Sequence, residues 1–463
     1  MRDEHVRLVP IIDAGIKIEK GYKAYEEGVK NGYFCKNEDG TDFVGGVWPG
    51  RVHFPDPLNK KAREWFGESY RFLIDKGIEG FWNDMNEPAL FYSAAGLDRL
   101  FNEVRKFEKQ NMEISVYNEF LGLVGGLPNN REDYLRIYHN ADGKKIRHDK
   151  VHNLYGYGIT RAAGEAFEKI SPKKRILLFS RSSCIGMHRY AGIWMGDNKS
   201  WWSHLLMNLK MLPSLNMVGI LYTGADIGGF GADATEDLVL RWTQLAVFNP
   251  LMRNHSAMGT RRQEAYRFDH TDAFRKIIGI RYSLIPYLYS EFMKAALTDD
   301  MMFRPLSFDY PGDTFARQVE DQVMVGDGLM ITPVYTQNAT GRYVYLPEHM
   351  LMICAASADE YECRILEAGH HYIDIPLNEM AFFLRPGHLL PLVRPAEYVD
   401  CLNTKKLKVI GWKGAASSYD LYDDDGESRN YSLNDSLRTI CISKDGVPEA
   451  EGGAAPELYA ELY

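Results

Sequence analysis

The chain has few cysteines, and they are not grouped. Six are scattered over 463 residues, without a CxxC pair or a Cys/His spacing typical of zinc. Their density is too low for a disulfide scaffold, so we expect a reducing, cytoplasmic compartment and no metal or other cofactor. No apolar run approaches the ~18 residues that cross a bilayer, so we expect no membrane partner.

The chain also has no excess of positive charge, since 54 Lys and Arg residues stand against 63 Asp and Glu residues. The formal net charge is −9, which argues against a nucleic-acid partner, because such proteins usually carry basic clusters. Hydrophobic residues at 45% and charged residues at 25% indicate an ordinary globular protein with room for one large domain and one or two small ones. The aromatic content of 13% suits sugar stacking, but a large core explains it more simply.

Strand-like and helix-like segments alternate over the first two-thirds of the chain. We expect strands near residues 7–12, 78–83, 175–180, 192–196, 217–223 and 248–253, and helices near 57–77, 161–169, 200–212, 236–247 and 272–296. Asp56-Pro57 predicts a helix N-cap and first position, and Pro213 is expected to end its helix. Strands separated by helices imply parallel βαβ units. Without a Gly-rich phosphate loop after the early strands, a β/α barrel is favoured over a doubly wound sheet.

Long connections and a change of pattern suggest the domain boundaries. We expect a barrel domain over residues 1–302, with inserted subdomains at about 14–55 and 88–160 that shape the mouth of a pocket. Short alternating segments then predict a β-sandwich over 303–396 and a smaller, distal β domain over 397–463. The acidic turn at 423–426 could bind calcium, but a solvated β-turn is favoured because the EF-hand spacing is absent.

Two carboxylates stand at the ends of predicted strands. Asp84 lies in the run Phe-Trp-Asn-Asp-Met-Asn-Glu-Pro at 81–88, and Asp197 lies in Gly-Ile-Trp-Met-Gly-Asp-Asn at 192–198. A retaining glycosidase needs two carboxyl groups about 5–5.5 Å apart, one nucleophile and one proton donor. The spacing Asp84-x-x-Glu87 also fits a helix capping box. The second carboxylate, at another strand end, favours catalysis.

Both runs resemble the catalytic motifs of glycoside hydrolase family 31, whose members cleave α-glycosidic bonds. The resemblance covers nearly the whole chain and implies an α/β fold with a (β/α)8 TIM-type barrel and C-terminal all-β sandwich domains. It implies that Asp84 is the nucleophile, after strand four, and that Asp197 is the acid/base, after strand six. The chain would then hold about strands 3–8. Strands one and two, the preceding β-sandwich and the family's aspartate after strand two would lie upstream of Met1.

The same resemblance implies a set of sugar-binding residues: Trp48, Trp82, Met85, Arg181, Trp194, Phe230 and His255. Taken one at a time, the aromatics would more simply be core and the histidine structural. For Arg181 the alternative is an ordinary ion pair, which its position at a strand end disfavours. Asp13 and Asp226 are weaker candidates that could orient Arg181 or a loop. The glycines of residues 224–230 fit a phosphate loop poorly, and a tight barrel loop is preferred.

The implied function is that of a retaining, exo-acting α-glucosidase that acts on terminal α-linked glucose of oligosaccharides by double displacement. The Met85-Asn86 pair differs from the α-xylosidases of the family, which carry Phe there. Two alternatives stay open: an α-glucan lyase on the same scaffold, and a non-catalytic or inactive fragment. The fragment gains support because missing barrel strands would expose strand edges and apolar surface. A homo-oligomer is also left open, and the motifs do not determine the linkage preference.

Overall fold

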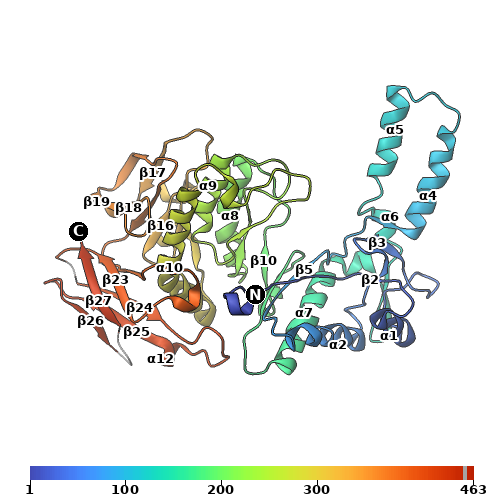
Figure 1. The fold of residues 1–463 in the computed structure, drawn as a ribbon, viewed down its shortest axis with the longest axis horizontal. Coiled ribbons are helices and arrows are strands. Elements are labelled where there is room, and N and C mark those ends of the chain that lie inside the picture. The colour runs from blue at the N-terminus through green and yellow to red at the C-terminus, as the bar shows by residue number, and fades with distance from the viewer. Residues whose placement is uncertain (415, 452–455) are drawn as a thin grey trace. The chain divides into compact units, whose positions relative to one another are not determined.

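The computed structural model describes residues 1–414, 416–451 and 456–463. The chain divides into two compact units, Met1–Ile193 and Trp194–Tyr463. Figure 1 colours the first unit from blue to green and the second from green to red. Each unit has its own buried hydrophobic core. Among the described residues, no helix is both long and apolar enough to cross a membrane.

A parallel sheet organises the first unit. Its strands are β1 (Ile11–Asp13), β5 (Gly80–Asp84), β9 (Leu177–Ser180) and the beginning of β10 (Gly192–Trp194). The register pairs Asp13 with Asp84 and Asn83 with Ser180. The carboxyl ends of β1, β5 and β9 therefore lie level with one another, and Arg181 follows directly after β9. Polar side chains are thus gathered at the edge where a β/α barrel carries its chemistry.

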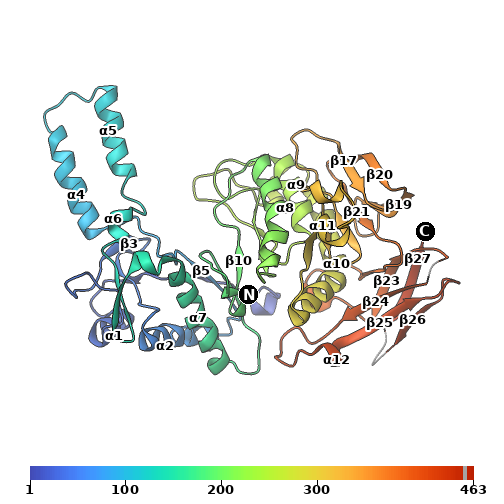
Figure 2. The same ribbon diagram turned by 180° about the vertical axis from the view of Figure 1, so that it is seen from behind.

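Further strands and helices accompany this sheet in the first unit. An antiparallel sheet in the order β2-β4-β3-β6 and a hairpin β7-β8 accompany the helices of the first unit. The strands are β2 (Ile16–Lys17), β3 (Gly45–Val47), β4 (Gly50–His53), β6 (Tyr92–Ser93), β7 (Tyr138–Ala141) and β8 (Lys144–Arg147). The helices are α1 (Lys23–Asn31), α2 (Lys60–Glu68), α3 (Arg71–Ile74), α4 (Ala94–Val104), α5 (Ile114–Gly125), α6 (Arg131–Tyr134) and α7 (His152–Ile170). In both views, α4 and α5 stand side by side as a hairpin (Figures 1 and 2).

The predicted start of the first long helix was wrong. Helix α2 begins at Lys60, and its N-cap is Asn59, whose side chain accepts hydrogen bonds from the backbone N–H groups of Lys61 and Ala62. Asp56 is engaged elsewhere: its carboxylate accepts from the Asn140 backbone at 2.6 Å and contacts the ring of His139 at 2.8 Å. These partners are far away in the sequence, so the local Asp-Pro signal could not show them.

The second unit begins with the remaining β/α elements. They are α8 (Trp202–Met217), β11 (Thr223–Gly224), β12 (Asp226–Ile227), α9 (Glu236–Ala246), β13 (Arg253–Asn254) and α10 (Thr271–Thr298), with β12 and β13 paired in parallel. Pro213 does not end α8, contrary to the prediction. The helix continues to Met217 with Pro213 buried inside it. Burial of Leu205, Leu209 and Leu212 on the same helix offsets the lost hydrogen bond.

Mainly antiparallel sheets follow in the second unit, as the alternation predicted, and the one parallel strand pair that the structure describes in them joins β23 and β27. Their orders are β14-β15-β16-β21-β18-β19, β17-β20, β22-β23-β27 and β24-β25-β26. The strands are β14 (Phe303–Pro305), β15 (Val323–Val325), β16 (Leu329–Ile331), β17 (Gly341–Leu346), β18 (Met350–Ala355), β19 (Tyr361–Leu366), β20 (Gly369–Asp374), β21 (Met380–Leu384), β22 (Leu390–Leu392), β23 (Lys406–Gly411), β24 (Ser417–Tyr422), β25 (Leu437–Ile442), β26 (Pro448–Glu451) and β27 (Glu457–Leu462). Short helices α11 (Leu306–Asp309) and α12 (Leu433–Ser436) lie between them.

Short 3-10 turns complete the described structure: η1 (Arg2–Glu4), η2 (Arg105–Phe107), η3 (His148–Lys150), η4 (Met187–Arg189), η5 (Ala265–Arg267), η6 (Ala316–Gln318) and η7 (Val399–Cys401). The acidic segment at 423–426 forms local turns. Asp424 accepts a hydrogen bond from the Gly426 backbone, and Asp425 accepts from the Glu427 and Ser428 backbones. These contacts fit the β-turn reading of that segment.

Candidate active site

Asp84 is the last residue of β5, and two donors meet its carboxylate. The Met85 backbone N–H donates to Oδ1 at 2.7 Å, and a guanidinium nitrogen of Arg181 lies 3.1 Å from the same oxygen. The side chain is 17% exposed. A neighbouring cation and a backbone donor both favour a charged carboxylate. The arrangement thus presents a partly accessible carboxylate oxygen at a strand end.

Glu87 completes this group. Arg181 donates to both oxygens of Glu87, from Nε and from a terminal nitrogen, each at 2.9 Å. The same terminal nitrogen lies 3.2 Å from the Met85 sulfur. No helix follows Asp84, because residues 85–90 form a bend, turns and coil, so the capping-box alternative for Asp84 and Glu87 is excluded. Glu87 instead holds the guanidinium fork in a fixed plane.

Buried amides hold the two loops that carry these charges. Asn86 is fully buried and donates to the Ser180 hydroxyl at 2.9 Å, while its oxygen accepts from the Ser182 backbone at 3.2 Å. The Arg181 backbone donates to the Asn83 carbonyl at 3.1 Å. Sequence reasoning missed Asn86 and Glu87 as positioning residues. The signal was present in the motif, since both polar residues follow a buried strand.

Asp13 is the third charged group at this edge. Burial and, to a smaller extent, the nearby Asp84 raise the pKa of Asp13 to about 6, against the opposing effect of Arg181. This weaker sequence candidate therefore belongs electrostatically to the Asp84 group. Met85, next to Asp84, has a positive φ of 54°, a sparsely populated conformation for a residue with a side chain.

The two tryptophans predicted in the first unit differ in their surroundings. Trp82 is buried in β5 and stacks on Phe179 with ring centroids 5.9 Å apart. Trp48 lies in the tight connection between β3 and β4, is 67% exposed, and meets Phe91 edge-on at 4.9 Å. Trp48 therefore offers an open aromatic face, whereas Trp82 contributes mainly to the packing behind Asp84.

Asp197 lies in the second unit, just after β10, and its side chain is exposed. The adjacent Asn198 is buried and links three segments. Its amide donates to the Asn208 side chain at 3.2 Å and to the Asp226 carbonyl at 3.0 Å, and its side-chain oxygen accepts from the Phe230 backbone at 2.9 Å. Asn198 thereby fixes the backbone that carries Asp197 against the 226–231 loop. Sequence reasoning did not single it out.

The glycines of residues 224–230 serve close packing. A Cβ on Gly224 would come 1.9 Å from the Leu251 carbonyl oxygen, and one on Gly229 would come 2.3 Å from the Ser200 backbone nitrogen. Gly229 also has a positive φ of 91°. These contacts fit the tight barrel loop preferred from the sequence, rather than a phosphate loop.

The structure brings further predicted residues of the second unit together. Phe230 and His255 stack with ring centroids 5.2 Å apart. Burial and the nearby Arg253 lower the pKa of His255 to about 4, so its imidazole is neutral at pH 7. Arg253 also lies over the Trp194 ring, 5.2 Å from its centroid, and forms an ion pair with Asp226. Asp226 therefore orients Arg253.

Gln263 joins the loops around His255. Its buried side-chain amide lies 2.9 Å from the Ile227 carbonyl, 3.2 Å from the His255 carbonyl and 3.1 Å from the Asn254 side-chain oxygen. A cavity of about 590 Å³ opens beside it, lined by His255, Asn254, Gln263 and apolar residues that include Phe274 and Ile278. No local motif distinguished Gln263 in the sequence.

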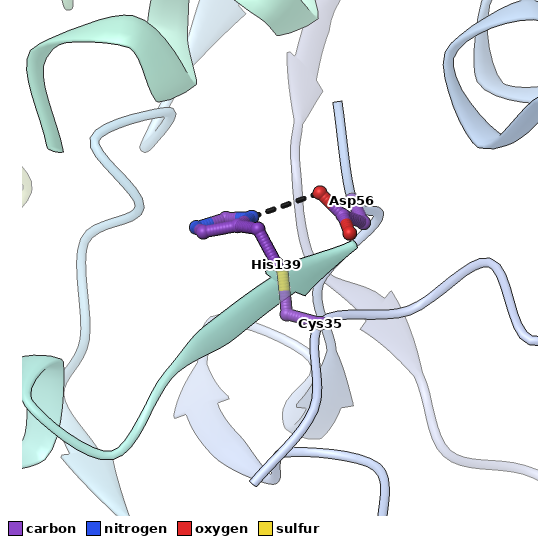
Figure 3. A group of neighbouring side chains, drawn as sticks. All are labelled: Cys35, Asp56 and His139. Atoms are coloured by element: carbon purple, nitrogen blue, oxygen red, sulfur yellow. Dashed lines mark hydrogen bonds and ion pairs between the residues drawn. The ribbon is translucent and has the colours of Figure 1, made fainter. Parts of the chain in front are cut away.

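One cluster among the described residues has ligand atoms close enough for a metal ion. The ligand atoms of Cys35, Asp56 and His139 lie within 4.8 Å of one another, and all three residues are buried (Figure 3). Hydrogen bonds already engage these atoms: His139 Nδ1 lies 2.8 Å from Asp56, and its Nε2 lies 2.9 Å from His148. A second contact of 2.8 Å continues from His148 to His152. The chain of rings ties the insertion to the start of α7.

Two family models match the chain. The model described as glycosyl hydrolases family 31 TIM-barrel domain matches residues 1–291, and the family 31 C-terminal domain matches residues 299–390. The chain belongs to glycosyl hydrolase family 31. The predicted TIM-type barrel, followed by a C-terminal β-rich region, is thereby confirmed for this family 31 chain.

Similar proteins agree with this assignment. The family 31 chain is 34% identical to Alpha-glucosidase 2 from Bacillus thermoamyloliquefaciens, over 95% of its own length and 51% of that protein. It is 32% identical to lysosomal alpha-glucosidase from Mus musculus, over 91% of its own length and 45% of that protein. The chain thus spans about half the length of these relatives.

Solved structures show the same fold. The Flavobacterium johnsoniae GH31 dextranase FjDex31A, complexed with glucose, is 25% identical with a TM-score of 0.76, and the match covers 95% of this chain and 51% of the dextranase. The Gracilariopsis lemaneiformis alpha-1,4-glucan lyase has a TM-score of 0.80 at 19% identity, over 99% of this chain and 51% of the lyase. At that identity the likeness to the lyase concerns the fold alone.

Proposed function

We propose that this chain carries the catalytic machinery of a retaining, exo-acting α-glucosidase that releases terminal α-linked glucose from oligosaccharides. The observation that carries the proposal is the group formed by Asp84, Arg181 and Glu87 at the carboxyl ends of β5 and β9. An ionised carboxylate, held by a guanidinium at a barrel strand end, suits attack on an anomeric carbon. The two α-glucosidase relatives support the substrate class.

The proposed reaction is a double displacement. Asp84 attacks the anomeric carbon while Asp197 donates a proton to the leaving glycosidic oxygen, which gives a β-glucosyl ester on Asp84. Asp197 then removes a proton from water, and this water attacks the same carbon and releases α-glucose and free Asp84. Each carboxylate returns to its first protonation state, so the cycle requires no other reactant.

The remaining predicted residues have supporting roles in the proposal. Arg181 holds Asp84 and offers its fork to sugar hydroxyls, and the neutral His255 stacks on Phe230 and offers ring nitrogens to a hydroxyl. Trp48 supplies an exposed aromatic face for a pyranose. Trp82 and Met85 of the first unit, and Trp194 of the second, keep the sugar-binding roles predicted from the sequence. The domain boundaries at 302 and 396, and a homo-oligomer, are also part of the proposal.

A proton NMR time course with maltose and isomaltose tests the overall reaction. Release of α-glucose before mutarotation supports the proposal, and the relative rates give the linkage preference. Early β-glucose would contradict retention. Anhydrofructose in place of glucose would identify a lyase. A folded chain that leaves both sugars intact would favour the inactive-fragment alternative.

Azide rescue separates the roles of the two carboxylates. With an activated 4-nitrophenyl α-glucoside, Asp84→Ala should form β-glucosyl azide, because azide enters from the face that the carboxylate vacates. Asp197→Ala should form α-glucosyl azide, because the glucosyl ester still forms and azide then attacks it without needing a base. If Asp84→Ala gave the α-azide and Asp197→Ala the β-azide, the roles of nucleophile and acid/base would be reversed. Near-native hydrolysis by Asp84→Ala would remove Asp84 from the mechanism.

A further inference from the structure

The helical hairpin of α4 and α5 is held together by apolar side chains on facing sides. Figures 1 and 2 show the two helices next to each other in opposite views. Phe107, in the turn after α4, meets Phe120 of α5 edge-on at 6.3 Å. Half-buried residues of α5 at helical spacing continue this side: Val116, Phe120 and Leu123. One apolar stripe of α5 therefore closes the hairpin.

A second apolar stripe on α5 faces solvent. Exposed fractions are 74% for Ile114, 46% for Tyr117, 45% for Leu121 and 39% for Val124. Their spacing of three, four and three residues is that of positions a and d in a heptad. At 100° per residue this seam lies roughly 110° around the helix from the stripe that faces α4. None of the residues of α5 is buried.

The scarcity of charge on α5 limits the kinds of partner that its exposed seam can bind. Glu119 is the only charged residue within α5, and it forms an ion pair with Lys106 of the same hairpin at 3.0 Å. The helix has no lysine or arginine, which interfacial membrane helices usually carry on their polar face. The seam therefore suits a neutral, apolar surface with the same helical repeat. Another α5 seam has these properties.

We infer that the α5 seam (Ile114, Tyr117, Leu121 and Val124) is a self-association surface that pairs with the same seam of a second copy of this chain. An isologous two-fold contact lets one patch serve both partners. In the antiparallel arrangement Tyr117 of one copy lies against Leu121 of the other, and the two hairpins form a four-helix bundle. The seam spans about 15 Å, so the contact belongs to the small, weak class of interfaces, with a dissociation constant in the micromolar range.

Sedimentation velocity of the purified chain, from about 1 to 100 µM, tests this inference. The wild-type chain should shift from monomer to dimer over that range. Leu121→Glu places a charge in the middle of the seam and should weaken dimerisation at least 10-fold. Gly122→Glu is the matched control, since it adds the same charge at the next position, where a Cβ would meet nothing within 4 Å. It should leave dimerisation within about 3-fold of wild type.

Other results would overturn the inference. A wild-type chain that is monomeric at 100 µM has no such surface, and binding of that monomer to neutral phosphatidylcholine vesicles would instead assign the seam to a membrane. If Leu121→Glu dimerises as tightly as the wild type, the contact lies elsewhere on the chain. The same conclusion follows if Gly122→Glu weakens dimerisation as much as Leu121→Glu does. Far-UV circular dichroism and thermal unfolding show whether each variant keeps its fold, and Tyr117→Lys provides an independent seam variant.

Discussion

Asp13 and Asp84 occupy paired positions at the ends of the neighbouring parallel strands β1 and β5. Two carboxylates so placed raise each other's cost of ionisation, and Arg181 partly offsets this repulsion. The register of one short strand pair therefore sets the electrostatics of the candidate nucleophile.

Asp13→Asn should stabilise the protein at neutral pH. The pKa of Asp13 is about 6 in the fold, against 3.8 for a free aspartate, so the folded state binds the proton more tightly. Wild-type stability from this group thus falls as pH rises from about 4 to 6. The advantage of the variant should grow over that window to on the order of 1 kcal/mol, discounted because Asp13 is partly exposed.

Urea unfolding of both proteins between pH 4 and 8 measures the difference. The exposed carboxylate of Asp75 in the same unit gives the control variant Asp75→Asn, which should show little pH-dependent change. A difference between wild type and Asp13→Asn that stays constant over this range would contradict the proximity of Asp13 to Asp84.

Arg181→Lys should lower kcat/KM by about 100-fold or more. Lysine keeps the charge but cannot donate in parallel to both oxygens of Glu87 while contacting Asp84. The matched control is Arg161→Lys, which alters a more exposed ion pair with Glu165 within α7. Steady-state kinetics with maltose decide the matter. A variant within 3-fold of wild type would show that the fork is dispensable.

Asn198→Asp should destabilise the second unit by about 1–3 kcal/mol. The substitution replaces the amide donor with a carboxylate oxygen, so the Asn208 side-chain oxygen and the Asp226 carbonyl lose their hydrogen-bond donor. Because Asn198 follows Asp197, kcat should fall more than KM rises. Denaturant unfolding and kinetics test both effects, with the exposed Asn118→Asp as control. Unchanged stability would disprove the bridging role.

His255 should titrate near pH 4. Burial and Arg253 disfavour its charged form, whereas an unfolded histidine takes up its proton near pH 6.5. Between these values the unfolded state binds more protons, so acidification through this window should reduce stability. Carbon–proton NMR of the histidine rings gives the midpoint, and the signal missing from His255→Phe assigns it. A midpoint at 6 or above would refute the buried, neutral imidazole.

Much of the fold was accessible from local pattern. Helices α9 and α10 lie within two residues of their predicted bounds, because long amphipathic segments carry a repeated signal. Short strands were less accurate: β11 covers Thr223–Gly224 only, since α8 runs on through Pro213. A proline signal is local, while the burial that overrides it comes from other segments.

The sequence by itself determined the family, the order of barrel and β-rich region, and the presence of Asp84 and Arg181 after buried strands. Contiguous motifs and the alternation of apolar residues are enough to predict these properties. The tertiary structure alone decided that Glu87 pairs with Arg181 rather than capping a helix, and that Asn59 replaces Asp56 as a cap. It also decided that Asp13 lies level with Asp84, and that α5 keeps an apolar seam in solvent. Such outcomes depend on strand register and on contacts between residues distant in sequence, which no local pattern encodes.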